Sequence, residues 1–376
     1  MMRHDKANST SPDEPARTDL WLWLIPMILS GLGILMVTST TSSFVYDISG
    51  SPFTMGLRQF RSLGFGFMMM MLTICIPTRF WRNIAAFMWV MSLIMLICTL
   101  IPGIGSSVGG ARRWLRIAGI SIQPSEVAML AVVLRMGKLF EKHSGDIWTC
   151  FKAVLLLICI TIFPVLMQPD LGSAILLVLV CMGMFVERNG WKLPLMTGTA
   201  GALLLLLLIK REPYRLRRWD AFMDPFADPL NTGFQTIQGL IAFANGGTWG
   251  AGLGHGFQKL HYLPAAYTDF IFAALGEELG LIGTLGVLAL MTMWLARCRF
   301  IYKQTLGGFE TSIVWGITLT IVGPFFVNVG GVTKLIPLTG MPLPFVSYGG
   351  SALVMSWVSI GILLRVQRDI AIGVAS

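Results

Sequence analysis

Long apolar runs alternate with short polar segments along almost the whole chain. Each run is close to the roughly 20 residues that a helix needs to cross the hydrocarbon core of a membrane. About ten such runs occur, at 21–39, 60–77, 84–101, 121–140, 152–168, 171–187, 191–209, 268–296, 311–330 and 349–366. The pattern predicts an all-α polytopic membrane protein of about ten transmembrane helices, with a large extracytoplasmic loop between helices seven and eight.

The two ends and the long polar loop divide the chain into regions. Residues 1–19 combine prolines with charges of both signs, which is typical of a disordered tail. The apolar run that follows is as long as a membrane span and has no small-residue cleavage site behind it, which argues against a signal peptide. We therefore predict a membrane domain at 20–368 with an outer loop at 210–267, and a C-terminal tail at 369–376.

The composition excludes a water-soluble protein. Hydrophobic residues make up 55% of the 376 positions and charged residues 12%, against roughly 25% charged in soluble proteins. So few charges cannot cover the surface of a soluble chain of this length. The six cysteines stand in or beside apolar runs without the paired spacing of a zinc site or a redox dithiol, and are interpreted as small membrane hydrophobes.

The basic residues give the chain a formal net charge of +9. They form no long cluster, which argues against a nucleic-acid-binding surface. Because the number of predicted spans is even, both termini lie on one side of the membrane. The short loops on that side each carry two or three lysines or arginines, so the positive-inside rule places both termini in the cytoplasm.

Most basic residues on the opposite side are concentrated in two loops, 103–120 and 210–267. The insertion rule gives no reason for positive charge there, so the loops are candidates for binding an anionic ligand. The alternative is that loops of this length are translocated whatever their charge.

Asp269 stands where the long outer loop meets the eighth predicted span, in the sequence Thr-Asp-Phe-Ile-Phe at 268–272. We expect Thr268 to cap this helix. An aspartate in the first turn faces the positive end of the helix dipole, which favours the ionised form that a general base needs. The alternative is an ordinary capping carboxylate without chemistry.

Several charged residues fall inside predicted spans. Glu277 and Glu278 follow Asp269 by eight and nine residues, about two helical turns deeper. Glu126 and Arg135 belong to the fourth span. Because charge inside a membrane is costly, we expect these side chains to face the bundle interior or a water-filled cavity and to find partners on other helices.

Three further motifs favour a polar cavity. Gln-Pro-Ser-Glu at 123–126 and Gln-Pro-Asp at 168–170 each place a proline at an expected helix start, where unpaired amides gather polar ligands. The segment 342–351 is too broken for a helix and too apolar for a solvated loop. Such backbone is tolerated at membrane depth where it is buried in protein or lines a cavity.

Six motifs occur in an order that points to one family. They are Gly-Ala-Arg-Arg-Trp-Leu at 110–115, Gln-Pro-Ser-Glu at 123–126, Gln-Pro-Asp-Leu-Gly at 168–172, Gln-Lys-Leu to Leu-Pro at 258–264, Thr-Asp-Phe-Ile-Phe-Ala and Gly-Glu-Glu-Leu-Gly within 268–280, and the segment 342–351. Over residues 20–368 the chain resembles the shape, elongation, division and sporulation (SEDS) family, which includes FtsW, RodA and SpoVE. The division branch, FtsW, looks most similar, although the segment 337–344 looks more like RodA.

The resemblance implies an inverting peptidoglycan glycosyltransferase. Such an enzyme polymerises lipid II, the undecaprenyl-diphosphate-linked disaccharide pentapeptide, on the outer face of the bacterial cytoplasmic membrane, here for septal wall synthesis in cell division. Asp269 matches the family's essential aspartate, which would act as general base while undecaprenyl diphosphate leaves. The implied substrate-binding residues are Arg112, Arg113, Trp114, Gln123, Ser125, Glu126, Asp170, Arg218, Lys259, Glu277, Ser347 and Tyr348.

The resemblance also implies partners. These are lipid II, a class B penicillin-binding protein with transpeptidase activity, and other membrane proteins of the division machinery at the septum. Arginines such as Arg112 and Arg113 suit diphosphate oxygens because a guanidinium donates two parallel hydrogen bonds. Mg²⁺ or Mn²⁺ would suit the same diphosphate, but the sequence shows no set of metal ligands.

The chain departs from the family pattern at several positions. Met129 stands where the family usually has a lysine, and we interpret Arg135, about two turns further on, as a substitute. Residues 265–267 are Ala-Ala-Tyr in place of Glu-Ala-His. Lys334 replaces a frequent glycine, and Ala352 replaces a serine. None of these changes removes Asp269.

Two other functions stay open from the sequence. One is a lipid II flippase or other transporter, in which Glu126, Glu277, Glu278 and Arg135 would form a relay. The other is a non-catalytic scaffold for a transpeptidase. A transporter should show inverted repeats, and the sequence has no convincing internal repeat. A carboxylate at the outer end of a helix suits chemistry on one face better than alternating access.

Overall fold

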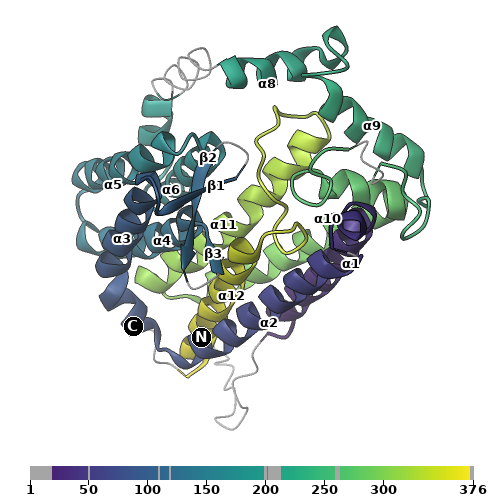
Figure 1. Ribbon diagram of the computed structural model, residues 1–376. Coiled ribbons are helices and arrows are strands. Elements are labelled where there is room, and N and C mark those ends of the chain that lie inside the picture. The colour runs from purple at the N-terminus through teal and green to yellow at the C-terminus, as the bar shows by residue number, and fades with distance from the viewer. Residues whose placement is uncertain are drawn as a thin grey trace, which may run out of the picture.

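The computed structural model of the chain describes residues 19–49, 51–108, 111–117, 120–198, 201, 213–258 and 263–372. Within these residues nine long helices match nine of the ten predicted runs (Figure 1). They are α1 (Trp21–Ser49), α2 (Thr54–Cys75), α3 (Thr78–Leu100), α4 (Pro124–Lys142), α5 (Ile147–Met167), α6 (Leu171–Asn189), α10 (Ile271–Gln304), α11 (Gly308–Val332) and α12 (Gly350–Ala371). Of the tenth run, 191–209, only residues 191–198 and 201 belong to the described part of the chain.

Seven of these helices, all except α2 and α4, are long and apolar enough to cross a membrane. This confirms the predicted multi-pass architecture. The helix α4 contains Glu126, Arg135 and three further charged residues, yet most of its positions are buried by protein. It packs against α3, α5, α6 and α11, so protein rather than lipid surrounds most of this helix.

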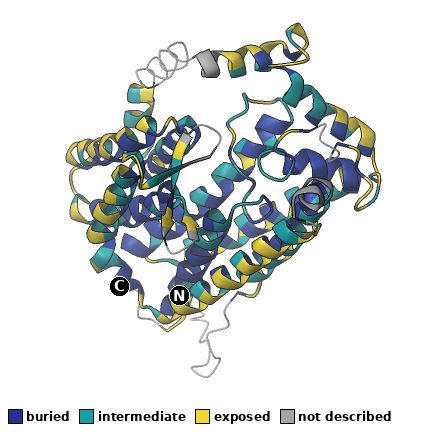
Figure 2. Cartoon of the chain, in the orientation of Figure 1, coloured by how far each residue is buried: buried dark blue, intermediate teal, exposed yellow. Residues whose placement is uncertain are grey.

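The apolar side chains of the bundle fall into two groups. One group is buried between helices, and its largest members include Trp294, Trp357 and Phe325. The other group is exposed on the outer faces of α2, α3 and α5, where Phe65 and Phe87 are examples, and Figure 2 shows these exposed faces at the edge of the bundle. In a membrane these outward apolar faces contact lipid, which agrees with the hydropathy of the runs.

A three-stranded antiparallel sheet occupies the segment that we expected to be a loop. Its strands β1 (Gly105–Val108), β2 (Ala111–Ile117) and β3 (Ile120–Ile122) are ordered β1-β2-β3 and lie against the start of α4 and the end of α3. The strands are too short and irregular for their alternation to be recognised in the sequence. The register shifts between Ser106 and Ser107 of β1, which leaves Arg113 at a bulge of β2, next to Arg112.

The long outer segment contains helices of its own. They are α8 (Pro213–Met223), the short 3₁₀ helix η1 (Pro225–Ala227) and α9 (Phe234–Gly246). The helix α9 packs along α10, whereas α8 lies at the periphery of the molecule, at the top of Figure 1.

The helix α10 is interrupted at Gly280, which has a φ of +67°. The glycine-rich loop 247–258 provides hydrogen-bond partners for the backbone at this interruption. The N–H groups of Ala251 and Gly252 donate to the carbonyls of Glu277 and Glu278 at 2.9 and 3.0 Å. In return the carbonyl of Gly247 accepts from Leu281 N at 2.9 Å, so the freed backbone groups find partners inside the protein. The glycines of this loop therefore serve close backbone approach.

Ion pairs connect the helices at the end of the bundle where α1 begins and α12 ends. Asp19, just before α1, pairs with Arg297 of α10. Arg82 of α3 pairs with Glu141 of α4, and Arg365 pairs with Asp369 on α12, a helix that continues to Ala371. This end, predicted to be cytoplasmic, is held together by charges that satisfy one another.

Candidate functional site

A cavity of about 240 Å³ opens at the end of the bundle where α4, α6 and α12 begin and where the chain enters α10. The strand β2 forms one wall, and the segment 339–349 between α11 and α12 forms another. The prediction that the broken segment lines a cavity is therefore confirmed. Four chain segments that start helices meet here, so the site collects polar backbone as well as side chains.

The cavity brings together most of the residues predicted for the site. Those that line it are Arg113, Trp114, Gln123, Ser125, Glu126, Asp170, Asp269, Ser347 and Tyr348. Arg112 is exposed on β2 and lies outside the cavity lining, as do Arg218 and Glu277. Lys259 lies outside the described residues. Met129 lines the cavity in place of the expected basic group, and Arg135 does not reach the lining.

Asp269 precedes α10, which begins at Ile271 with Phe270 as its N-cap. Our expectation that Thr268 caps this helix was wrong, since its hydroxyl donates to the carbonyl of Ala265 at 3.3 Å. The residues before α10 form a turn, because Thr268 N and Phe270 N both donate to that same carbonyl. Because of this turn α10 begins only at Ile271, and Asp269 lies at the cavity, outside the apolar span.

Three successive carbonyls fix the backbone at Asp269. The carbonyl of Tyr267 accepts from the N–H of Tyr348 at 2.9 Å, and that of Thr268 accepts from the Ser347 hydroxyl at 2.6 Å. The carbonyl of Asp269 accepts from the Asn328 amide at 2.8 Å, and the same amide donates to Met341 at 2.7 Å. These contacts clamp the end of the outer loop to α11 and to the segment before α12.

The charge of Asp269 is set by opposing influences. Burial raises the pKa of its carboxyl group above the ordinary 3.8, while the Arg218 guanidinium, a hydrogen bond from Thr268 and the Arg113 guanidinium act to lower it. Burial prevails, so the pKa of Asp269 is raised. A carboxylate with a raised pKa takes up a proton more readily than an exposed aspartate, which suits a general base.

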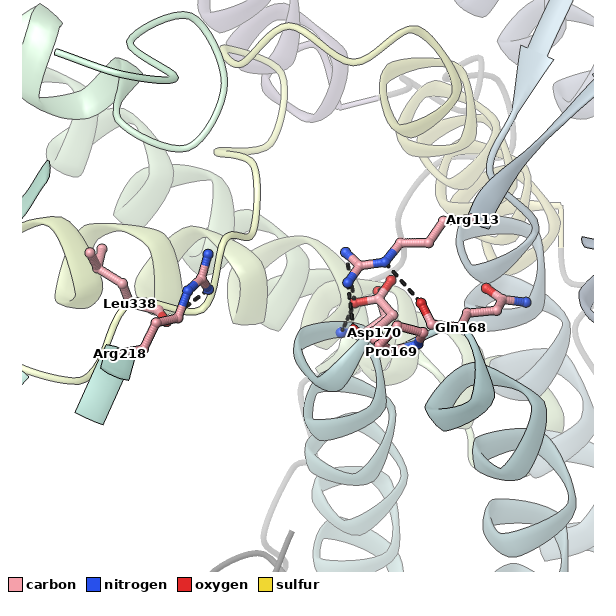
Figure 3. Close-up of polar contacts among 7 residues, drawn as sticks. Arg113, Gln168, Pro169, Asp170, Arg218 and Leu338 are labelled. Atoms are coloured by element: carbon pink, nitrogen blue, oxygen red, sulfur yellow. Dashed lines mark hydrogen bonds and ion pairs between the residues drawn. The ribbon is translucent and has the colours of Figure 1, made fainter. Parts of the chain in front are cut away.

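Arg113 connects the sheet to the turn between α5 and α6 (Figure 3). Its Nε donates to the carbonyl of Gln168 at 3.2 Å and its Nη2 to that of Pro169 at 2.5 Å, while Nη1 lies 3.7 Å from an oxygen of Asp170. Asp170 in turn caps α6 by accepting from Ser173 N at 3.2 Å. The guanidinium is therefore anchored on one side and lines the cavity on the other.

The two Gln-Pro motifs have different roles in the structure. At α4 the prediction of a helix start is confirmed, with Gln123 as N-cap and Pro124 in the first turn. Ser125 is buried at the cavity wall, and its hydroxyl has no hydrogen-bond partner among the described residues. In the second motif Gln168 instead follows the end of α5, where its buried amide donates to Leu96 O and to the Thr99 hydroxyl.

The side chains of Glu277 and Glu278 accept hydrogen bonds from the glycine-rich loop, and they do not line the cavity. Glu277 accepts from the N–H groups of Phe257 and Gln258, each at 3.1 Å, and from the Asn245 amide at 3.2 Å. Glu278 accepts from Gly254 N at 3.1 Å and from the Ser39 hydroxyl of α1. Their expected place inside the protein is confirmed, but the structure places Glu277 away from the other predicted substrate-binding residues.

Two residues of the site were missed in the sequence. Asn328 holds the backbone at Asp269, and its position as a lone amide inside the apolar run 311–330 was the available signal. Gly340 has a φ of +74° and lines the cavity, but nothing in the sequence distinguishes it from other loop glycines. Within the described residues no group of three or more His, Cys, Asp or Glu side chains could hold a metal ion.

Comparison with known proteins gives consistent results along the whole chain. Residues 19–371 match the FTSW_RODA_SPOVE family model, described as cell cycle protein. The probable peptidoglycan glycosyltransferase FtsW of Coxiella burnetii is 33% identical, with 93% of this chain and 96% of that protein aligned. The protein of the same name from Geobacter metallireducens is 37% identical, with 94% and 96% aligned.

Solved structures agree with the fold. A chain from a structure described as structural coordination of polymerization and crosslinking by a peptidoglycan synthase complex superimposes with a TM-score of 0.78 and 27% identity. The alignment covers 94% of this chain and 98% of that chain. The rod shape determining protein RodA of Thermus thermophilus superimposes with a TM-score of 0.69 and 24% identity, covering 94% and 97%, and shares the fold.

Proposed function

Because the chain belongs to the FtsW, RodA and SpoVE family of cell cycle proteins, we propose that it is a peptidoglycan glycosyltransferase that polymerises lipid II. Polymerisation takes place on the outer face of the bacterial cytoplasmic membrane and serves septal wall synthesis. The observation that carries the proposal is the position of Asp269: a clamped backbone holds this carboxylate at a cavity that Arg113 and Trp114 also line.

In the proposed reaction Asp269 accepts the proton of the acceptor sugar's 4-hydroxyl group. The resulting oxygen nucleophile attacks the anomeric carbon of the donor and forms the new glycosidic bond with inversion. The bond between that carbon and the diphosphate oxygen breaks, and undecaprenyl diphosphate leaves with the electron pair. A half-buried base held in one geometry lowers the entropic cost of this step.

The remaining cavity residues bind the substrate in this proposal. Arg113 holds diphosphate oxygens, since its guanidinium lines the cavity and is anchored behind it. Arg112, the neighbour of Arg113 on β2, adds positive charge for the diphosphate, and the family resemblance gives Lys259 the same role. The sugar hydroxyls contact Gln123, Ser125, Glu126, Asp170, Ser347 and Tyr348, which offer both donors and acceptors.

The comparisons support one of the proposed protein partners. A solved relative belongs to a complex that coordinates polymerization and crosslinking, which supports a class B penicillin-binding protein as transpeptidase partner of this chain. Other membrane proteins of the division machinery are expected at the septum. Mg²⁺ or Mn²⁺ would screen the diphosphate charge, and assays with and without each ion measure that contribution.

A polymerisation assay tests the proposal. The purified chain and its Asp269→Ala variant are given lipid II, alone and with a transpeptidase partner, and glycan strands are separated on a gel. We expect strands from the wild type and none from the variant. Equal polymer from both would disprove the base role of Asp269, and no polymer from either would favour the scaffold or the flippase.

A further inference from the structure

Arg218 approaches the site from α8, a helix outside the transmembrane bundle. Its Nη1 donates to the carbonyl of Leu338 at 3.2 Å, in the segment between α11 and α12 (Figure 3). The side chain is half-buried, whereas the neighbouring Arg217 is exposed. This hydrogen bond attaches a peripheral helix to the segment that lines the cavity.

Gly340 lies between this guanidinium and the proposed base. A Cβ atom built on Gly340 would be 3.3 Å from Nη1 of Arg218 and 3.3 Å from Oδ2 of Asp269. The two charged atoms are therefore no further apart than twice that distance. Opposite charges at such a separation, in a partly buried site, stabilise one another's ionised forms.

The other groups around Asp269 do not replace this contact. Arg113 acts on Asp269 from β2 more weakly than Arg218, and Thr268 contributes a hydrogen bond. Glu126 and Asp170 line the same cavity, and neither carboxyl group can supply the positive charge that Arg218 brings. Of the surrounding groups, the Arg218 guanidinium opposes the effect of burial on the pKa of Asp269 most strongly.

We propose that Arg218 is a positioning residue for the base: its guanidinium, admitted beside Asp269 by the missing side chain of Gly340, keeps that carboxylate ionised. This assigns Arg218 to Asp269 rather than to the diphosphate of the substrate. The inference rests on the proposed function for its catalytic consequence, but the ionisation of Asp269 is measurable without turnover.

The direct test is the pH dependence of carboxyl modification. Dicyclohexylcarbodiimide reacts with protonated carboxyl groups, and peptide mass spectrometry measures the modified fraction at Asp269 in the purified full chain. In Arg218→Gln we expect the midpoint of labelling to move roughly one pH unit upward, because a nearby opposite charge is lost. Arg218→Lys keeps the charge and should stay close to the wild type.

Matched variants separate this role from a structural one. Arg217→Gln removes the same charge from the adjacent, exposed position and should leave the midpoint unchanged. Gly340→Ala leaves both charged residues in place but puts a methyl group between them, and we expect a midpoint shift in the same direction as in Arg218→Gln. An identical midpoint in Arg218→Gln and wild type would overturn the inference.

Polymerisation rates separate this inference from the proposed function. If the function is correct, Arg218→Gln should lose rate mainly at low pH and recover toward wild type as the pH rises. If the wild type makes no polymer, the proposed function fails, and if Asp269→Ala polymerises lipid II like the wild type, the base role of Asp269 fails; in both cases the labelling midpoints still decide on Arg218. A uniform loss of rate at every pH, with unshifted labelling, would assign Arg218 to substrate binding.

Discussion

Asp269 and Glu277 stand eight residues apart, and both are acidic groups withdrawn from solvent, yet their surroundings differ. Glu277 accepts hydrogen bonds from two backbone N–H groups and an amide, which hold a glycine-rich loop against a broken helix. Asp269 has its backbone fixed while its carboxylate lies at a cavity. A carboxylate whose oxygens are already bound to the protein stabilises structure, whereas one held beside open space is available to a substrate.

The largest expected effect is a loss of polymerisation rate when Asp269 is replaced, which distinguishes Asp269 from Glu277. Asp269→Asn should lower the polymerisation rate by about 10²- to 10⁴-fold, because a general base contributes that much. Burial raises the pKa of Asp269 above its value in the unfolded chain. The folded state therefore loses stability as the pH rises from the unfolded pKa through the folded pKa and the carboxyl group ionises. At neutral pH the variant should therefore melt at the same or a higher temperature than the wild type.

Asp220→Asn, at an exposed position on α8, is the control for this prediction. It changes the same chemical group without touching the cavity, and we expect wild-type polymer on a gel. A strong loss of melting temperature in Asp269→Asn would show that Asp269, like Glu277, acts as a structural carboxylate.

The next effect tests the clamp on Asp269. Asn328→Leu removes the donors to the carbonyls of Asp269 and Met341, and the base is no longer held in place. A displacement of about 1 Å at a reacting group costs roughly 10²-fold in rate, and we expect a loss of that order in single-turnover assays. Asn231→Ala, in the outer segment, is the control; an unchanged rate in Asn328→Leu would exclude the clamp.

The role of Glu277 is tested by the melting temperature of a variant. Glu277→Gln puts an amide where two backbone N–H groups need an anionic acceptor, and hydrogen bonds to charged groups contribute about 1.5–3 kcal/mol. We expect a lower melting temperature and faster proteolysis of the loop 247–258, with rate per folded molecule largely retained. Equal melting temperatures together with lost activity would move Glu277 to the site.

The pH dependence of the rate refines the picture of Asp269. The base acts when ionised, so activity falls as the pH drops through its pKa. Because that pKa is raised above 3.8, the acid limb of the rate profile should lie above the range of an ordinary aspartate. Initial rates between about pH 4 and pH 8 measure this limb, and a limb at the ordinary aspartate value would contradict the raised pKa of this group.

The smallest effect is expected at the end of the bundle where α1 begins and α12 ends. Arg82→Gln breaks an ion pair with Glu141 in which the arginine is 41% exposed. Surface ion pairs contribute about 0–1 kcal/mol, so the melting temperature should change little and polymerisation should be unaffected. A large loss of activity would show that this end takes part in the reaction, as a transport mechanism requires.

The sequence predicted the bundle more completely than the site. Nine apolar runs became helices, because a chain in lipid must satisfy its backbone within each span, and hydropathy alone reveals that need. The helix ends were less accurate: α10 begins at Ile271 and runs to Gln304, since its polar turns extend past the apolar core. The sheet from Gly105 to Ile122 was missed because its short strands carry no clear alternation.

The membrane architecture, the motifs of the family and the candidate base, Asp269, were all evident from the amino-acid sequence. The tertiary structure decided which predicted residues meet: it joined Asp269 to Arg113 and Ser347 at one cavity and assigned Glu277 to a loop. It also supplied Asn328 and Gly340, whose roles depend on contacts with segments far away in the chain. Hydropathy is a local property of the sequence, whereas the hydrogen bonds and charges around one carboxylate arise only when distant segments pack together.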